Sequence, residues 1–262
     1  MEHNLGFIGC GNMASAILYG ALNAGFLKPE TTWLCETIPS RLEEAAAKSG
    51  AHPVSSLREL AGKADILLVA VKPAAIPAVL DELGGALRGK AVVSIAVGWL
   101  FEKFAPLLPE GARFAHVMPN TPCMVGEGMA LVEEKNSLTP EELAYVEGLF
   151  GSIGRCEVLP SHLMGVGGVL SGCAPAYLYM LIEALADGAV YHGMPRDMAY
   201  RLAAQMVKGS GRMVLETGLH PGILKDNVCS PGGTTIRGVR ALEEGGFRSL
   251  LIDAVDRPLQ EK

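Results

Sequence analysis

The sequence lacks the clustered ligands that a metal site requires. Its six cysteines include no Cys-x-x-Cys pair, and its six histidines are scattered without the short spacings of zinc ligands. This usage fits a reducing compartment, and we predict a cytoplasmic protein without a bound metal. The cysteines stand at positions 10, 35, 123, 156, 173 and 229.

Positive charge and long apolar runs are also scarce. The 22 lysines and arginines face 28 acidic residues, which gives a formal net charge of −6 and no basic surface for nucleic acid. No apolar run approaches the length that crosses a bilayer, and the N-terminus lacks a basic and then apolar secretion signal. We therefore expect neither nucleic acid nor a membrane as a partner. The 262 residues, 49% of them hydrophobic, predict a compact protein of two domains.

Apolar strand candidates alternate with helical stretches over the first 160 residues. Their order predicts an α/β fold, a doubly wound and mostly parallel sheet with helices on both faces. The predicted strands are 5–8, 32–35, 66–71, 91–95, 113–118, 129–133 and 156–159, and the predicted helices are 16–24, 40–49, 57–63, 76–87, 99–107 and 140–151.

The sequence changes character at Ser161, where long runs rich in alanine, leucine and methionine begin and strand signals end. We predict one domain over residues 1–160 and an all-helical domain over 161–262, with helices at 164–172, 176–191, 196–216 and after Thr235. The apolar side chains within 177–185 cover more than the single stripe that a surface helix buries. This breadth predicts burial against another subunit, and hence a homodimer.

The segment Gly9-Cys10-Gly11-Asn12-Met13-Ala14 joins the first predicted strand to a helical run. Gly9 permits a tight turn, Gly11 lets the backbone approach a pyrophosphate, and the small Ala14 lets the helix pack closely on the strand. The pattern predicts a dinucleotide-binding loop. The alternative is a glycine turn in some other α/β domain.

A second informative segment, Cys229-Ser230-Pro231-Gly232-Gly233-Thr234-Thr235-Ile236, precedes another helix-like run. Proline and two glycines compress the backbone there, so amide groups and hydroxyls converge at a helix N-terminus. We expect this segment to hold the carboxylate of a small substrate. The alternative is an ordinary capped helix start.

Taken together, these motifs resemble those of the pyrroline-5-carboxylate reductase family. The resemblance covers nearly the whole chain and includes the glycine loop, Ala70-Val71-Lys72-Pro73, Met118-Pro119-Asn120-Thr121-Pro122, Leu170-Ser171-Gly172, Pro175-Ala176-Tyr177 and residues 220–235. It implies a Rossmann domain followed by a helical dimerisation domain, and reduction of 1-pyrroline-5-carboxylate to L-proline with NADH or NADPH.

The resemblance also implies roles for individual residues. Thr235 occupies the position of the hydrogen-bond donor to the imine, while Ser230 and the backbone of Gly232, Gly233 and Thr234 would hold the ring carboxylate. The implied cofactor contacts are Gly9, Cys10, Gly11, Asn12, Met13, Glu36, Val71, Lys72, Pro73, Val97 and Asn227.

Glu36 bears on the choice of cofactor because it stands at the end of the second predicted strand. A carboxylate there would bond the ribose hydroxyls of NAD and repel a 2′-phosphate, which favours NADH. Arg41 nearby, and the family's common acceptance of NADPH, favour the other choice. A solvated glutamate at a strand end is the third interpretation.

Three other functions fit parts of the pattern. A 3-hydroxyacid dehydrogenase would share the glycine loop and helical domain but needs a lysine base, for which Lys208 is the obvious candidate. Another cyclic-imine reductase would use the same carboxylate seat. A nucleotide-sensing protein without catalysis would not need the complete turn from Pro231 to Thr235.

Overall fold

The computed structural model describes residues 3–260, which form two compact units divided after Gly172. The first unit contains all eight strands, and the second consists of helices alone within the described residues.

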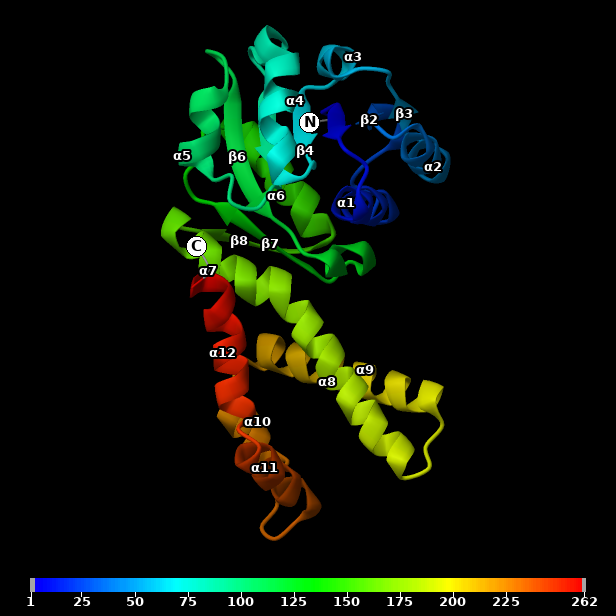
Figure 1. Cartoon of the computed structure of the whole chain (residues 1–262), viewed down its shortest axis with the longest axis vertical. Coiled ribbons are helices and arrows are strands. Elements are labelled where there is room, and N and C mark those ends of the chain that lie inside the picture. The colour runs from blue at the N-terminus through cyan, green and yellow to red at the C-terminus, as the bar shows by residue number, and fades with distance from the viewer. Residues whose placement is uncertain (1–2, 261–262) are drawn as a thin grey trace. The chain divides into compact units, whose positions relative to one another are not determined.

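The first unit is built on one eight-stranded sheet with the order β3-β2-β1-β4-β5-β6-β7-β8 (Figure 1). All neighbouring strands are parallel except β6 and β7, which η5 (Thr121–Val125) joins by a short connection. A short connection of this kind suits antiparallel neighbours. The strands are β1 (Leu5–Ile8), β2 (Thr32–Cys35), β3 (His52–Pro53), β4 (Ile66–Val69), β5 (Ala91–Ser94), β6 (Arg113–Met118), β7 (Gly128–Glu133) and β8 (Gly154–Leu159).

Helices cover both faces of this sheet because the central strands are apolar on both sides. Along β4, Ile66 and Leu68 belong to one core cluster, whereas Leu67 and Val69 belong to the other. One face packs against α1 (Asn12–Asn23), α2 (Pro39–Ser49) and α6 (Pro140–Ser152), and the other against α3 (Leu57–Lys63), α4 (Ile76–Leu83) and α5 (Phe101–Phe104). The predicted doubly wound sheet is confirmed.

The differences from the predicted elements are local. The short edge strand β3 was not predicted, because two exposed residues carry no periodicity. Helix α1 begins at Asn12, four positions before the predicted start, since the glycine loop itself enters the helix. The predicted helices 76–87 and 99–107 each end in a 3₁₀ turn, η3 (Gly84–Leu87) and η4 (Ala105–Leu107).

Residues 161–172 pack on the sheet of the first unit, although their amino-acid composition resembles that of the helical second unit. The Ser161 hydroxyl donates to Glu133 at 2.6 Å, and a Cβ at Gly167 would lie 2.7 Å from Leu159 and 2.8 Å from Leu131. The small glycines thus let α7 (Met164–Gly168) approach β7 and β8 closely. The predicted division after residue 160 marks this change of composition, while the compact units divide after Gly172.

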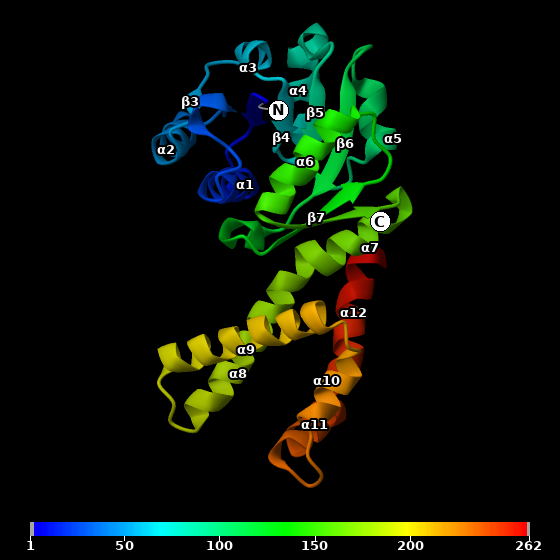
Figure 2. The same cartoon turned by 180° about the vertical axis from the view of Figure 1, so that it is seen from behind.

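The second unit contains two long helices, α8 (Ala174–Tyr191) and α9 (Arg196–Thr217), which pack against each other (Figures 1 and 2). Three shorter helices follow: α10 (Pro221–Asn227), α11 (Thr234–Glu244) and α12 (Phe247–Gln260). The Tyr177 hydroxyl donates to the Ala254 carbonyl at 2.9 Å and ties α8 to α12. Helix α10 was not predicted.

Very little of the second unit is buried within one chain. Among its described residues only three alanines, Ala186, Ala199 and Ala203, are buried. Large apolar side chains remain exposed along the same helices, among them Leu178, Tyr179, Met180, Leu185, Leu202, Met206, Leu215, Leu250 and Ile252. A chain that left this surface in water would forgo most of the hydrophobic stabilisation of its own helices.

One apolar run is longer than the sequence led us to expect. Helical segments from Ser161 to Tyr191 form a 31-residue stretch that could cross a membrane by length and composition, so the expectation that no run approaches that length is wrong. The stretch is not one regular helix, because a π-turn, η7 (Val169–Cys173), interrupts it. Apolar helices that pack against another protein chain have the same length and composition.

The buried His116 on β6 predicts how stability depends on pH. It is 1% exposed, its Nδ1 has no hydrogen-bond partner in the described structure, and burial lowers its pKa from 6.5 to about 4. The unfolded chain therefore takes up this proton first as the pH falls. The stability that neutral His116 permits is present above about pH 6.5 and is lost as the pH falls toward 4.

In the parent protein, His116 should lower the free energy of unfolding by roughly 1.4 kcal/mol per pH unit as the pH falls from 6.5 to about 4. We expect His116→Gln to abolish this part of the pH dependence. Denaturant unfolding at several pH values and one fixed protein concentration measures this slope. The exposed His162, changed to Gln, is the control and should leave the slope as in the parent. An unchanged slope in His116→Gln would mean that other groups govern acid unfolding.

Candidate functional site

The first unit gathers the predicted cofactor residues at one edge of the sheet. Gly9 follows β1, Glu36 follows β2, Val71 lies just beyond β4, and Val97 lies in the loop after β5. These four strands are parallel and adjacent, so their carboxyl ends share one edge. This edge, next to the crossover between β1 and β4, is where doubly wound folds bind nucleotides.

The turn after β1 requires glycine at its first position. Gly9 has φ of +96°, a conformation that residues with a Cβ rarely adopt. A Cβ there would also lie 3.0 Å from the Ala70 carbonyl oxygen and 3.2 Å from Val71 Cγ1. The glycine loop and the loop after β4 are therefore in direct contact, and Val71 supports the turn.

The start of α1 leaves backbone amide groups for a ligand. Gly11 is the N-cap residue and offers no side-chain cap, while Asn12 and Met13 begin the first turn. A Cβ at Gly11 would meet no atom within 4 Å, so the backbone there borders open space. Such a helix start attracts phosphate through its amide groups and dipole, and the arrangement therefore fits the pyrophosphate of a dinucleotide.

Cys10 contributes its backbone to this loop. Burial, and to a lesser degree the nearby Glu36 and Cys35, raises the pKa of the Cys10 thiol to about 12, so the thiol stays protonated. Its amide donates to Glu36 Oε2 at 2.8 Å. The loop after β1 is therefore joined to the end of β2 by a charge-assisted hydrogen bond.

Glu36 accepts two further hydrogen bonds from its own loop, from the Ile38 amide and the Thr37 hydroxyl, both at 3.1 Å to Oε1. Burial alone would raise the pKa of Glu36, but the bonds from Cys10, Ile38 and Thr37 lower it below its usual value. Glu36 is therefore an ionised carboxylate fixed beside the glycine loop.

Lys72, Pro73 and Val97 extend the same edge. Lys72 is exposed at the start of η2 (Pro73–Ala75), whose proline fixes the direction of the chain after β4. Val97 is 58% exposed, unusual for an apolar side chain in a loop whose neighbours Ala96 and Trp99 are buried. A planar ligand ring, such as nicotinamide, would cover the Val97 side chain if it lay against it.

In the second unit, Ser230 to Gly233 form a turn that leads into α11. The Gly233 amide donates to the Ser230 carbonyl at 3.0 Å. Pro231 supplies the fixed φ of the second position, and Gly232, with φ of +69°, supplies the third. This is the residue pattern of a type II turn.

Gly233 is required for space rather than for its backbone angles. Its φ of −70° suits any residue, but a Cβ would lie 2.5 Å from Ser230 Oγ and 3.1 Å from the Ser230 carbonyl oxygen. The Ser230 hydroxyl therefore lies directly over the start of α11. Thr234 and Thr235 are the first two residues of this helix, and Gly233 provides no side-chain cap for its amides.

The amides of the first turn of α11 and the hydroxyls of Ser230 and Thr235 are thus available together. Within residues 3–260 the Thr235 hydroxyl makes no hydrogen bond. Amide donors at a helix start, with hydroxyls beside them, suit a carboxylate. Asn227 belongs to the same unit, where it is the last residue of α10.

Three polar residues with a positioning role were not predicted. Arg237 Nε donates to the Gly233 carbonyl at 3.2 Å, and His220 Nδ1 accepts from Gly222 and caps α10. Asn120 donates to the Ser171 carbonyl at 2.9 Å and accepts from the Met129 amide at 2.8 Å. Arg237 stands four residues after Gly233, the N-cap residue of α11, and this spacing was the available signal.

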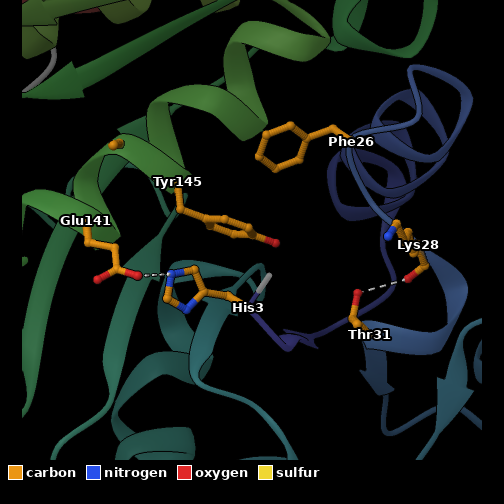
Figure 3. A pocket seen from close by; sticks show the side chains of 7 residues that line it. His3, Phe26, Lys28, Thr31, Glu141 and Tyr145 are labelled. Carbon is orange, nitrogen blue, oxygen red and sulfur yellow. Dashed lines mark hydrogen bonds and ion pairs between the residues drawn. The ribbon is translucent and has the colours of Figure 1, made fainter. Parts of the chain in front are cut away.

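A cavity among the described residues, shown in Figure 3, lies away from the predicted site residues. It has a volume of about 340 Å³ and is lined by His3, Phe26, Lys28, Thr31, Glu141, Ala144 and Tyr145. These residues precede β1 and β2 or belong to α6, so the cavity lies at the amino edge of the sheet, opposite the glycine loop. His3 Nε2 lies 3.8 Å from Glu141 Oε1, and no sequence-predicted site residue lines the cavity.

Comparisons with known proteins cover the whole chain. The family described as "Pyrroline-5-carboxylate reductase dimerisation" matches residues 161–262, and "NADP oxidoreductase coenzyme F420-dependent" matches residues 4–98. The pyrroline-5-carboxylate reductase of Escherichia coli is 44% identical over 100% of this chain and 97% of its own length, and that of Methanosarcina acetivorans is 40% identical over 98% and 95%.

A solved structure agrees with these matches. The pyrroline carboxylate reductase of Plasmodium falciparum with NADP bound has a TM-score of 0.89 and 32% sequence identity, covering 99% of this chain and 97% of that one.

The crowding at Gly233 makes a direct prediction. Gly233→Ala should displace the Ser230 hydroxyl and raise the KM for a carboxylate substrate roughly tenfold, while the affinity for the reduced cofactor stays within about twofold. Gly238→Ala is a matched control on the same helix, because a Cβ there would meet no atom within 4 Å. That control should keep both constants and gain up to about 1 kcal/mol of stability. If Gly233→Ala weakened cofactor binding as much as it raised the KM for the carboxylate substrate, a separate carboxylate-binding site would be contradicted.

Proposed function

The chain belongs to the pyrroline-5-carboxylate reductase family, and we propose which of its residues reduce 1-pyrroline-5-carboxylate to L-proline with NADH or NADPH. The 44% identity to the Escherichia coli reductase along the full chain is the observation that carries the activity. The geometry of the two helix starts supports the assignment of residues.

The strand edge of the first unit would hold the cofactor, which supplies a hydride when bound. The amides at the start of α1, from Gly11 to Met13, would bind its pyrophosphate. Val71, Lys72, Pro73 and Val97 would lie along its remaining length. Gly9 keeps the turn tight enough for the phosphates to approach.

The start of α11 would hold the ring carboxylate. The Thr234 amide and the Ser230 hydroxyl would bind it. Gly232 makes the turn before the helix, and Gly233, whose amide bonds the Ser230 carbonyl, leaves space for the Ser230 hydroxyl. Fixing the carboxylate fixes the ring, so that the C=N carbon faces the hydride donor in a reactive arrangement. Orientation is the main contribution of these residues.

Thr235 would act on the imine nitrogen. When the C=N carbon accepts a hydride, the nitrogen gains electron density and binds a proton. A hydroxyl donor beside that nitrogen stabilises the change. The Thr235 hydroxyl has no hydrogen bond to another group in residues 3–260 and stands in the first turn of α11.

The activity is tested by following the absorbance of the reduced cofactor with two substrates. The five-membered 1-pyrroline-5-carboxylate should be reduced with a kcat/KM at least tenfold above that for the six-membered piperideine-2-carboxylate. A preference for piperideine-2-carboxylate, whose imine carbon itself bears the carboxylate, would assign the chain to another cyclic-imine reduction. A 3-hydroxyacid dehydrogenase is not supported, because relatives that match the chain over nearly its full length, at 37–44% identity, are named pyrroline-5-carboxylate reductases.

We also propose that the protein is a cytoplasmic homodimer. The match to a dimerisation family over residues 161–262 and the exposed apolar helices of the second unit support the dimer. All six cysteines are free thiols, which suits a reducing compartment. A second copy would also cover the exposed apolar side chains of α8, among them Leu178, Met180 and Leu185.

The first prediction of this proposal concerns Thr235. Thr235→Val keeps the shape and deletes the hydroxyl, and should lower kcat/KM about tenfold to a hundredfold with little change in cofactor affinity. Thr139, which caps α6 through the Glu142 amide, provides a control for pure capping. Thr139→Val should lower stability by about 1 kcal/mol and leave the kinetics alone. If Thr235→Val behaves like Thr139→Val, Thr235 is a capping residue and not a donor.

The second prediction concerns assembly. Sedimentation at micromolar concentration should show a dimer or a larger assembly of dimers, because one chain leaves the second unit almost unburied. Dilution should lower the thermal midpoint, since folding and association are linked. A folded and fully active monomer would rule out the proposed dimer.

A further inference from the structure

Glu36 differs from an ordinary carboxylate at a strand end because three protein groups hold it in place. The Cys10 amide binds Oε2 at 2.8 Å, and the Ile38 amide and Thr37 hydroxyl bind Oε1 at 3.1 Å each. A solvated glutamate changes rotamer at little cost. Glu36 would have to leave all three donors, including one in the loop that would cradle the pyrophosphate.

The distribution of these bonds leaves room for one kind of ligand. Each carboxylate oxygen accepts about two hydrogen bonds. Oε1 already accepts two and Oε2 accepts one, so Oε2 retains one place for a donor. A ribose hydroxyl is such a donor, whereas a 2′-phosphate offers only acceptor oxygens and negative charge.

The charges around Glu36 do not compensate for a phosphate. No lysine or arginine forms an ion pair with Glu36 in residues 3–260. Its partners are the Cys10 and Ile38 amides and the Thr37 hydroxyl, and the nearby thiols of Cys10 and Cys35 are neutral. Arg41, in the first turn of α2, is the nearest cation in the sequence, but its side chain forms no hydrogen bond or ion pair with Glu36 in the described structure. A 2′-phosphate would therefore meet a fixed negative charge.

We propose that Glu36, fixed by the Cys10 amide, makes this enzyme select NADH over NADPH. The inference rests on the proposed function and adds to it the residue and the direction of cofactor choice. Because the same carboxylate holds the glycine loop, rejection of the 2′-phosphate and the shape of the pyrophosphate cradle depend on one side chain.

The test compares binding of the two cofactors with no substrate present. Titration of reduced-cofactor fluorescence should give a Kd for NADH at least tenfold below that for NADPH. In Glu36→Gln the side-chain oxygen can still accept from the Cys10 amide, but the charge is gone. NADPH binding should then tighten roughly tenfold while NADH binding weakens only a few-fold.

A matched control lies at the other end of the same strand. Glu30 is exposed in η1 (Pro29–Thr31), just before β2, and Glu30→Gln removes the same charge from the amino edge. It should leave both dissociation constants unchanged. If it changes the ratio as Glu36→Gln does, net charge and not Glu36 selects the cofactor.

A measurement on the parent protein covers the case in which Glu36→Gln does not fold. AMP should compete with NADH at least tenfold better than adenosine 2′,5′-bisphosphate, which carries the extra phosphate. The proposal is overturned if the bisphosphate binds as tightly as AMP or more tightly, or if NADPH binds as tightly as NADH or more tightly. Reductase activity with NADPH would still leave the proposed function intact. Failure to bind either cofactor overturns both.

Discussion

Two helices of this protein begin on a glycine that has no side chain to cap them, and the arrangement of the sites depends on this feature. Gly11 before α1 and Gly233 before α11 share an extended conformation, with φ of −73° and −70° and ψ of −179° and 177°. Helices α3, α6 and α10 instead receive caps from Ser56, Thr139 and His220. The uncapped amides of α1 and α11 are left for anions from outside the chain, a pyrophosphate in one case and a ring carboxylate in the other.

Each uncapped start is held by a polar contact behind it. Glu36 binds the Cys10 amide beside the start of α1, and Arg237 binds the Gly233 carbonyl beside the start of α11. Fixing the Gly233 carbonyl also fixes the opposite, amide side of the same peptide group. The loops are therefore preorganised by charged side chains that themselves remain outside the anion-binding positions, and little backbone ordering is left for the ligand to impose.

The sequence predicted the elements that have strong periodicity or special turn chemistry. The apolar strands and the glycine at position 9 could be read directly, because buried parallel strands and positive φ restrict the residues that fit. The bond from Cys10 to Glu36 could not, since it joins residues 26 positions apart through a backbone amide. The same holds for Asn120, whose two partners lie on different elements, and for the two-residue strand β3, whose existence depends on its neighbour β2. The apolar breadth of α8 was visible in the sequence, but the near absence of burial in the second unit required the structure.

The central claim, that the two ligands bind to two separate uncapped helix starts, is tested most directly by hydrogen exchange of the full-length protein with each ligand alone. NADH should slow amide exchange at residues 9–13 and at Val71 and Lys72. A saturated five-membered-ring carboxylate, which cannot be reduced, should slow exchange at Ser230 and at residues 232–236. Protection of residues 230–236 by the carboxylate without NADH would support two independent seats. Protection by the carboxylate only around His3 and Tyr145, or none at 230–236, would contradict the account.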